Sequence, residues 1–270
     1  MRLKLISAVI SGLLLSTPAM AADLSKETKD YKDFVVVQID ELVTQTESFV
    51  GALKNGDVEK AKAVYPLARM YYERSEPIAE SFGDLDPRID ARLADLEEEG
   101  KGEKDWSGFH KIEKVLWEQN TTKGTEETAD QLLKDVKELR AKIPTTEVTP
   151  ELMITGAVDL LNEVSTTKVT GEEDIFSKTD LYDFKANVEG AEKIYELFKP
   201  ALLKKDAKLS AKIEQHFKEV NDLLQKYNKS STGYEYVPYN TLTKEDTKAL
   251  AEAVNKLGEP LAQLGVILDK

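Results

Sequence analysis

Apolar residues recur through most of this chain at alternating steps of three and four positions, the spacing that places them on one face of an α-helix. We find no convincing alternation of apolar and polar residues of the kind typical of a strand. Asn55-Gly56 ends the first stripe, and Asp57 is positioned to cap the next helix. The clearest stripes are Val35, Ile39, Leu42, Thr46, Phe49 and Leu53; Phe184, Val188, Ala191, Tyr195, Phe198 and Leu202; and Ile213, Phe217, Val220, Leu224 and Tyr227.

The breaks between these stripes are short, and the longest irregular stretch covers residues 228–243. Long amphipathic helices joined by short loops pack as bundles, and this chain is long for a single four-helix bundle. We therefore predict an all-α fold, an elongated double four-helix bundle. Its N-terminal bundle would span residues 23–144 and its C-terminal bundle residues 145–270, with no flexible linker between them.

The first 22 residues have the composition of an export signal. Arg2 and Lys4 are basic, residues 5–15 are almost continuously apolar, and residues 18–21 end in the small-x-small pattern that signal peptidases cut. The apolar run is shorter than the roughly 20 residues that span a bilayer. We predict cleavage after residue 21 or 22 and a soluble periplasmic protein. No cysteine lies near the cut, so we expect no lipid anchor.

The composition of the chain limits the partners and the metal ligands that can be expected. The formal net charge of −13 becomes −15 once Arg2 and Lys4 are removed with the signal. Such an acidic protein repels nucleic acid and anionic lipid and favours cations. The chain has no cysteine, which excludes disulfides and thiolate ligands. Any metal site must use oxygen and imidazole, and these donors favour hard or borderline ions over copper(I).

Three glutamates, Glu73, Glu76 and Glu80, lie three and four positions apart in a predicted helix over residues 65–82 and would share one face. Like charges at this spacing cost roughly a few tenths of a kcal/mol per pair, which a cation must offset. Pro77 removes a backbone hydrogen bond to the Glu73 carbonyl, so we expect a kink there. The glutamates form either one wall of a metal site or a solvated face neutralised by arginines of the same helix.

A turn rich in aspartate follows this predicted helix. Asp84, Asp86 and Asp90 could supply oxygen ligands to a hard cation. Aspartate is also among the best N-capping residues, and the spacing does not match an EF-hand loop. Both interpretations remain open for this turn.

His110 and Glu113 are three positions apart, so one imidazole and one carboxylate project from the same helix face and can reach the same ion. This H-x-x-E pattern is frequent by chance, and a structural histidine is the alternative. The chain has two histidines, and His216 is interpreted as an ordinary residue at the border of its apolar stripe. The apolar stripe beside the H-x-x-E pair consists of Phe109, Ile112 and Leu116.

Several blocks form a recognisable series: YERSEPIAE at 72–80, DLD at 84–86, IDAR at 89–92, GFHKIE at 108–113, NTTKG at 120–124, and the stretch from GEED at 171–174 to ANVEG at 186–190. In this order, and over nearly the whole mature chain, they resemble the imelysin-type domain of the EfeO/EfeM iron-uptake proteins. The resemblance implies an all-helical periplasmic protein of two four-helix bundles. It also implies a metal site at the H-x-x-E pair, a membrane iron permease and a haem-dependent peroxidase as partners.

Transferred residue by residue, the resemblance makes His110 and Glu113 metal ligands. The expected cargo is Fe²⁺ or Fe³⁺, with divalent ions such as Zn²⁺ or Ca²⁺ as further candidates. The acidic partners would be Glu73, Glu76 and Asp90, with Glu80, Asp84 and Asp86 as substitutes.

The chain departs from the EfeO pattern in two respects. After the predicted signal it runs directly into the first helix, so we expect the shorter EfeM-like form without a cupredoxin domain. Residues 177–184 read SKTDLYDF, with Lys178 and Tyr182 where the EfeO block has histidine and tryptophan. These changes put a second metal site in doubt. Asp180 and Asp183 either belong to such a site or complement the dipole at a helix start.

Three classes of function can be weighed from these residues. We favour capture of periplasmic iron and its delivery to an inner-membrane permease. A zincin-type peptidase needs two histidines one turn apart, and two distant histidines assemble no triad convincingly, so we predict no enzyme. The alternative is binding of an acidic polysaccharide such as alginate, bridged by metal or held by a basic patch. That patch would consist of Lys101, Lys104, Lys111 and Lys114.

Overall fold

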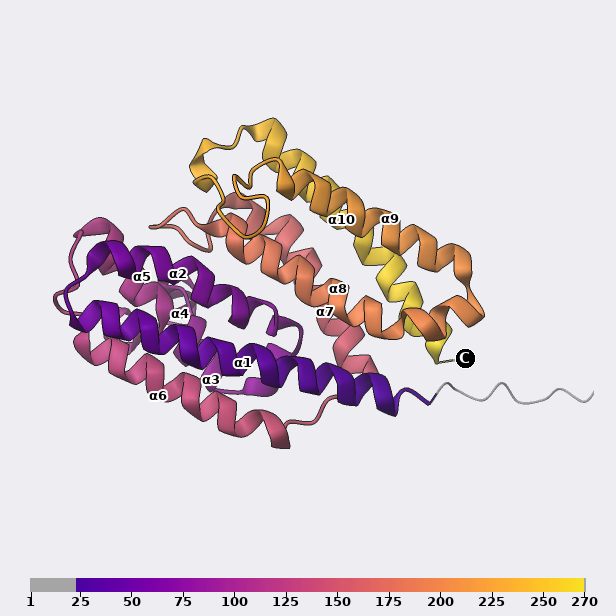
Figure 1. The fold of residues 1–270 in the computed structure, drawn as a ribbon, viewed down its shortest axis with the longest axis horizontal. Coiled ribbons are helices and arrows are strands. Elements are labelled where there is room, and N and C mark those ends of the chain that lie inside the picture. Colours follow the sequence, from indigo (N-terminus) through magenta and orange to yellow (C-terminus); the bar gives the residue numbers. More distant parts are fainter. Residues whose placement is uncertain (1–22, 270) are drawn as a thin grey trace, which may run out of the picture.

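The computed structural model describes residues 23–269 of the chain (Figure 1). The predicted export signal over residues 1–22 lies outside the described residues. Within the described span the regular structure is helical, apart from one isolated antiparallel bridge between Asn228 and Tyr236. The prediction of an all-α fold is confirmed. No helix in this span combines the length and the apolar character that crossing a bilayer requires.

The helices of the first half are α1 (Ser25–Lys54), α2 (Val58–Glu73), α3 (Leu85–Asp90), α4 (Leu93–Glu98), α5 (Phe109–Glu118) and α6 (Glu126–Lys142). Those of the second half are α7 (Pro150–Thr166), α8 (Asp180–Lys205), α9 (Ala207–Gln225) and α10 (Lys244–Leu268). Short 3₁₀ segments are η1 (Glu76–Phe82), η2 (Glu103–Asp105), η3 (Ile143–Thr145), η4 (Lys168–Thr170) and η5 (Tyr239–Thr241).

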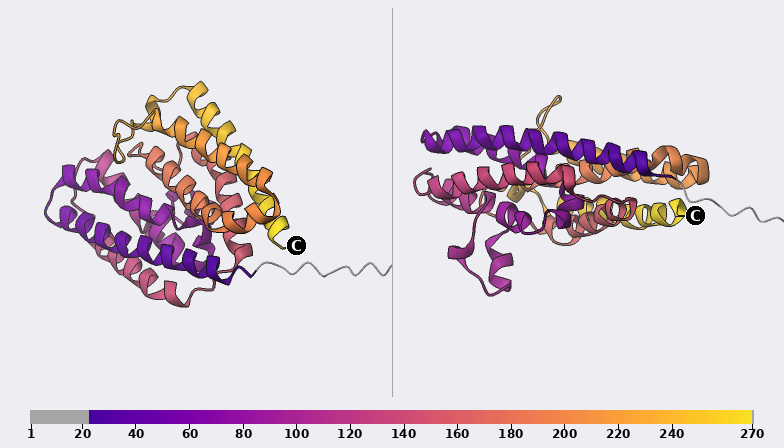
Figure 2. Two further views of the ribbon diagram at one scale, coloured as in Figure 1. Left: turned by 45° about the vertical axis from the view of Figure 1, so that its right-hand side comes forward. Right: turned by 90° about the horizontal axis from the view of Figure 1, so that it is seen from below.

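The long helices run roughly side by side in two groups (Figures 1 and 2). In the first, α1 packs against α2 and α6; in the second, α10 packs against α7 and α9, and α8 packs against both of these. The groups meet where α2 lies against α8 and η1 lies against α7. One continuous cluster of buried apolar side chains extends through both groups. The predicted boundary after residue 144 falls within η3, just before the connection to α7.

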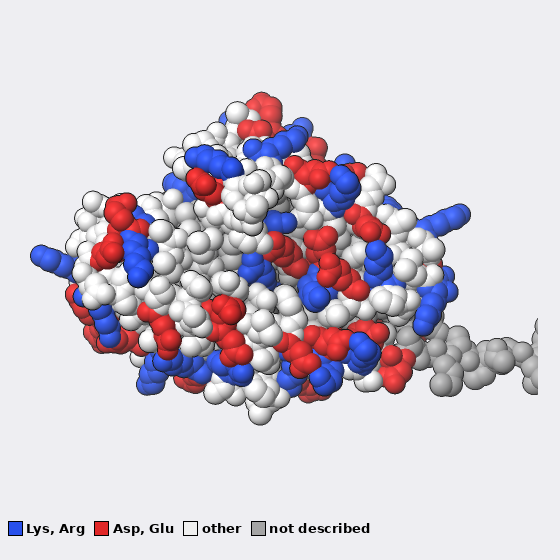
Figure 3. All heavy atoms as spheres, viewed as in Figure 1, with Lys and Arg blue, Asp and Glu red and all other residues white. Residues whose placement is uncertain are grey.

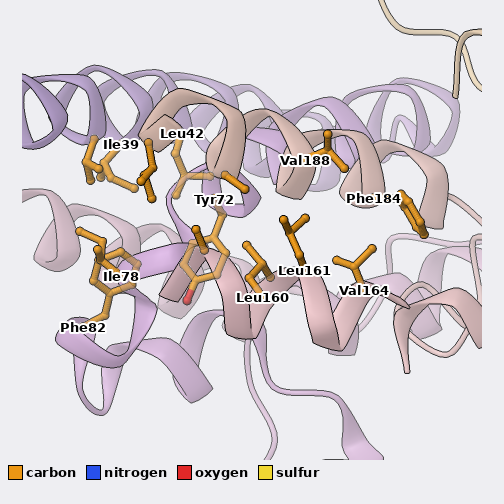
Figure 4. Close-up of a cluster of buried hydrophobic side chains, with 14 of the residues drawn as sticks. Ile39, Leu42, Tyr72, Ile78, Phe82, Leu160, Leu161, Val164, Phe184 and Val188 are labelled. Atoms are coloured by element: carbon orange, nitrogen blue, oxygen red, sulfur yellow. The ribbon is translucent and has the colours of Figure 1, made fainter. Parts of the chain in front are cut away.

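The predicted apolar stripes form this core. All six residues of the first stripe are buried in α1, as are all six in α8 and the first four in α9. Figure 4 shows the contact region, where Leu42 of α1, Leu161 of α7 and Val188 of α8 point into one cluster. Burying one such side chain stabilises the fold by about 1.5–3 kcal/mol, so these stripes supply most of the driving force.

The predicted helix over residues 65–82 is broken, which corrects the sequence-based expectation. Helix α2 ends at Glu73, and the chain continues into the 3₁₀ segment η1. Pro77 has no N–H to donate to the Glu73 carbonyl, which instead accepts a hydrogen bond from Asn187 Nδ2 at 3.2 Å. Glu73 and Glu76 therefore do not lie on one continuous helical face.

Two glycines allow the neighbouring helices to pack closely against this break. A Cβ on Gly156 of α7 would lie 1.7 Å from the carbonyl oxygen of Pro77. A Cβ on Gly190 of α8 would lie 2.5 Å from the carbonyl oxygen of Arg74. Since a side chain at either position would clash with backbone, glycine lets α7 and α8 approach the segment from 74 to 77 and fix its course.

The surface carries charges of both signs. On the face shown in Figure 3, acidic and basic side chains are interspersed, and no extended basic area is visible. Two of the lysines proposed for a basic patch are paired with acids: Lys101 Nζ lies 2.6 Å from Glu99, and Lys114 pairs with Glu103. This pairing weakens the case for a patch that would hold an acidic polymer.

Candidate metal centre

A group of buried charged side chains lies where α2, α3, α5 and α8 meet. Each of them is at most 11% exposed, although they come from distant parts of the sequence. Its members are Arg69 and Glu73 of α2, Asp90 of α3, His110 and Glu113 of α5, Glu173 and Asp174 of the loop before α8, and Asp183 in the first turn of α8.

The backbone brings His110 directly beside Asp90. Gly108, just before α5, has φ +90°, a conformation that side-chain-bearing residues rarely adopt. A Cβ at this position would lie 2.2 Å from the carbonyl oxygen of Ile89. The glycine therefore allows the start of α5 to contact the end of α3, and so joins the H-x-x-E pair to the aspartate predicted as its partner.

The two nitrogens of His110 have different surroundings. Nδ1 lies 2.9 Å from Glu113 Oε2 and 3.3 Å from the Tyr65 hydroxyl. Nε2 is buried and has no hydrogen-bond partner among the described residues. It faces Glu173 Oε1 at 3.5 Å and Asp90 Oδ1 at 3.7 Å. A carboxylate on one imidazole nitrogen, with the other nitrogen left without a hydrogen-bond partner, is the usual arrangement of a metal-binding histidine.

Proton equilibria at these residues follow from burial and charge. Burial raises the pKa of Asp90 to about 7, although Arg69 favours its ionised form. Burial and Arg69 lower the pKa of His110, but the carboxylates of Glu113 and Glu173 outweigh them and raise it to about 10. A metal ion that binds Asp90 and His110 must therefore displace protons.

Three overlapping sets of side chains bring ligand atoms within 4.8 Å of one another: Asp90, His110 and Glu173; His110, Glu113 and Asp174; and Glu73, Glu173 and Asp183. The second set is already saturated with hydrogen bonds. Glu113 Oε1 accepts from the backbone N–H and hydroxyl of Ser177, each at 2.8 Å, and Asp174 accepts from Tyr65 at 3.0 Å. The first set, which contains the unpartnered nitrogen, is the best candidate for a metal site.

Two members of this first set reach an open cleft. Asp90 and Glu173 are among the residues that line this cleft, which has a volume of about 420 Å³. Among its described lining residues Arg92 is the one cation. A cleft lined mainly by charges of one sign concentrates the electric field and attracts counter-ions. The carboxylates that line it are Glu76, Asp86, Asp90, Asp95, Glu99, Asp159, Glu163 and Glu173.

The five predicted ligands do not all belong to the same set of neighbouring ligand atoms. Asp90 and His110 share the first set, while Glu113 holds the opposite nitrogen of the imidazole. Glu73 pairs with Arg69 at 2.6 Å and takes part only in the third set. Glu76 belongs to none of the three sets and lies 2.9 Å from Lys168 Nζ, although it lines the cleft. Geometry thus gives these residues different roles around one centre.

Two of the three suggested substitutes, Asp84 and Asp86, have other partners, and the side chain of Glu80 lies outside the described part of the structure. Asp84 is exposed and lies 3.3 Å from Arg88, and Asp86 accepts a hydrogen bond from the Tyr72 hydroxyl. These contacts leave the first set dependent on a residue that the sequence-based prediction did not include.

Sequence reasoning missed Glu173. It appeared only inside the block at 171–174, and no spacing rule connects it to a histidine 63 positions earlier. Asp183, left open as a helix-start charge, is buried and accepts two hydrogen bonds from Arg69, at 2.9 and 3.1 Å. Asp180 is also buried and accepts from the backbone N–H of Asp174 at 3.2 Å. Lys178 adopts a left-handed φ of +61° in the same loop.

The fold and the site together define a class: an all-helical protein with a buried cluster of carboxylates around one histidine. The family model Imelysin (Peptidase_M75) matches residues 27–264, so the chain belongs to the imelysin family. It is 59% identical over 249 residues to an Efem/EfeO family lipoprotein of Staphylococcus haemolyticus strain JCSC1435, covering 92% of this chain and 85% of that protein. A protein of the same name from Staphylococcus aureus strain NCTC 8325 is 58% identical, with 92% and 87% covered. The predicted EfeO/EfeM resemblance is confirmed.

Proposed function

We propose that this protein captures iron in the periplasm and delivers it to the inner-membrane permease of an Efe-type uptake system that also contains a haem-dependent peroxidase. The observation that carries the proposal is the buried, unpartnered His110 Nε2, which faces two carboxylates, Asp90 and Glu173, that line an acidic cleft. Membership of the EfeM/EfeO family supports the assignment to iron uptake.

The donor set suits this cargo. One imidazole and two carboxylates match the borderline character of Fe²⁺, and the surrounding carboxylates also suit the harder Fe³⁺. Three protein ligands leave coordination positions for water or for a group of the receiving protein. A carrier needs such positions, because the ion must be taken over before it is released.

We infer a binding role in place of hydrolysis, although the family model carries a peptidase name. A zincin uses two histidines one turn apart with a glutamate between them. Here residues 110–113 read HKIE, and the second histidine of the chain, His216, lies in α9 beside Glu219. The residues around His110 therefore lack the ligand pair that activates water in that class.

The test is metal-dependent thermal stability. Protein stripped with chelator would be melted alone and with anaerobic Fe²⁺, Fe³⁺ citrate, Zn²⁺ or Ca²⁺. An ion at about a hundred times its Kd stabilises by about 2.7 kcal/mol, a shift of several degrees for a chain of this size. We expect iron to produce this shift, and we expect it to disappear in His110→Ala, Asp90→Asn and Glu173→Gln.

His216→Ala is the matched control, since it removes the other histidine from a half-buried position on α9. It should respond to iron like the wild type. If the three site variants also respond like the wild type, the ion does not bind at these residues. Delivery would be measured separately, as uptake of radioactive iron by cells that carry His110→Ala in place of the wild-type chain.

A further inference from the structure

Arg69 occupies the centre of the acidic cluster, and we propose that it is a built-in competitor of the metal ion. When the ion binds, Asp90 Oδ1 and Glu173 Oε1 exchange their contacts with the guanidinium for contacts with the ion. When the ion is released, the contacts with the guanidinium form again. This inference rests on the proposed metal-binding function of the same site and adds the residue that sets how tightly the ion is held.

The competition is for the same atoms. Arg69 Nη1 contacts Asp90 Oδ1, and Arg69 Nη2 lies 3.4 Å from Glu173 Oε1. These are the two carboxylate oxygens that His110 Nε2 faces at 3.7 and 3.5 Å. An ion bound between the imidazole and these oxygens needs the lone pairs that the guanidinium contacts. The two cations therefore cannot both make their full set of contacts.

Arg69 can give up these two oxygens without leaving the cluster. Its Nη2 also lies 2.6 Å from Glu73 Oε1, and its Nε and Nη2 donate to Asp183 Oδ2 at 3.1 and 2.9 Å. The guanidinium carbon lies 5.9 Å from the ring centre of Tyr65 and 5.7 Å from that of Phe109. None of these contacts involves Asp90 or Glu173, so they can hold the Arg69 side chain after it gives up both oxygens.

Burial keeps the competitor in place. The side chain of Arg69 is 0% exposed, so it has no path to solvent when the ion enters. A loaded site then contains a metal ion and a guanidinium as close neighbours, and their repulsion weakens binding. When the ion leaves, the guanidinium again neutralises carboxylates that would otherwise be buried without a partner. The same residue thereby favours release and stabilises the unloaded protein.

Other cations near the site do not share this position. Lys168 Nζ lies 3.2 Å from Glu73 and 2.9 Å from Glu76, on the side of the broken helix. Arg92 lies 3.7 Å from Glu173 Oε2, the oxygen that does not face the imidazole. Of the cations in the described cluster, Arg69 alone contacts both oxygens opposite His110 Nε2.

The experiment measures Fe²⁺ affinity by anaerobic competition with a chelating indicator, and the dissociation rate with excess chelator. Arg69→Gln should bind Fe²⁺ at least about tenfold more tightly than wild type and release it more slowly, because a neighbouring positive charge is gone. Arg140→Gln is the control: it removes the same charge from a surface pair with Asp40, and affinity should change less than about twofold.

A second variant guards against misfolding of Arg69→Gln. Arg69→Gln/Asp183→Asn removes one buried charge of each sign, and it should bind Fe²⁺ at least about tenfold more tightly than Asp183→Asn alone. Equal or weaker binding in both comparisons, with wild-type binding intact, overturns the exchange and leaves the proposed function standing. A wild-type protein that binds no iron removes the proposed function and this inference together.

Discussion

Glu113 Oε2 lies 2.9 Å from His110 Nδ1, on the side of the imidazole away from Asp90 and Glu173. In the proposed site the two residues of the H-x-x-E motif would therefore have different roles. Histidine would offer its other nitrogen to the ion, while glutamate would set the orientation of the ring. Glu113 is itself held by the backbone N–H groups of Phe176 and Ser177, at 3.1 and 2.8 Å.

The first prediction separates an orienting residue from a ligand. Glu113→Gln should weaken Fe²⁺ binding about 10- to 100-fold, the usual effect of losing the partner of a metal-binding histidine. Glu173→Gln should weaken it more, since a negatively charged ligand is lost. Anaerobic titration calorimetry gives both affinities. A Glu113→Gln variant that binds no iron while Glu173→Gln binds normally would show that the ion sits on the Nδ1 side.

The second prediction concerns pH. The pKa of His110 is about 10 and that of Asp90 about 7, so protons compete with the ion on the acidic side of these values. Affinity should therefore rise with pH, by about tenfold per unit between pH 7 and 8 and more steeply below 7, where Asp90 also holds a proton. Titration in buffers of different ionisation enthalpy counts the protons released. A flat profile between pH 6 and 8 contradicts this assignment.

The third prediction tests the acidic cleft as the route of entry. Neutralising Asp95, Glu99 and Asp159 together should slow association of Fe²⁺ and leave its dissociation rate unchanged, because these residues line the cleft without joining the ligand sets. The loss should shrink as salt is added, since screening removes long-range attraction. Stopped-flow mixing measures both rates. The charge-matched control neutralises three exposed acids outside the cleft, Glu196, Asp222 and Glu252.

The fourth prediction concerns the broken helix. Gly156→Ala should lower the free energy of unfolding by about 1–3 kcal/mol or more, because the added methyl group meets the Pro77 carbonyl oxygen. Gly51→Ala is the control: its Cβ would meet nothing within 4 Å in the last turn of α1, so the change should not destabilise the fold and should stabilise it by at most about 1 kcal/mol. Urea denaturation measures both. A Gly156→Ala variant as stable as the wild type would contradict this prediction, since it would show that α7 can shift away from the Pro77 carbonyl without cost.

Much of the secondary structure of this protein could be predicted from local sequence patterns. The helices follow from apolar spacing, because a stripe at steps of three and four can be buried only as a helix. The Asp57 cap was predicted and is present, with its side chain accepting from the Lys60 backbone N–H at 3.0 Å. The H-x-x-E pair could also be named from the sequence, since residues three apart share a helix face. Asp90 was predicted from the family resemblance, because α4 and η2 separate it from His110 along the chain.

Only the tertiary structure decided which atoms meet at the centre. Glu173 lies 63 positions from His110, and Asp183 lies 114 positions from Arg69. Their contacts depend on how α8 and the loop before it pack on α2 and α5. The break after Glu73 required Pro77, but its course depends on glycines in two other helices. Sequence spacing indicates which side chains share an element. Which nitrogen of His110 is free, and which cation holds the carboxylates, depends on the packing of elements far apart in the chain.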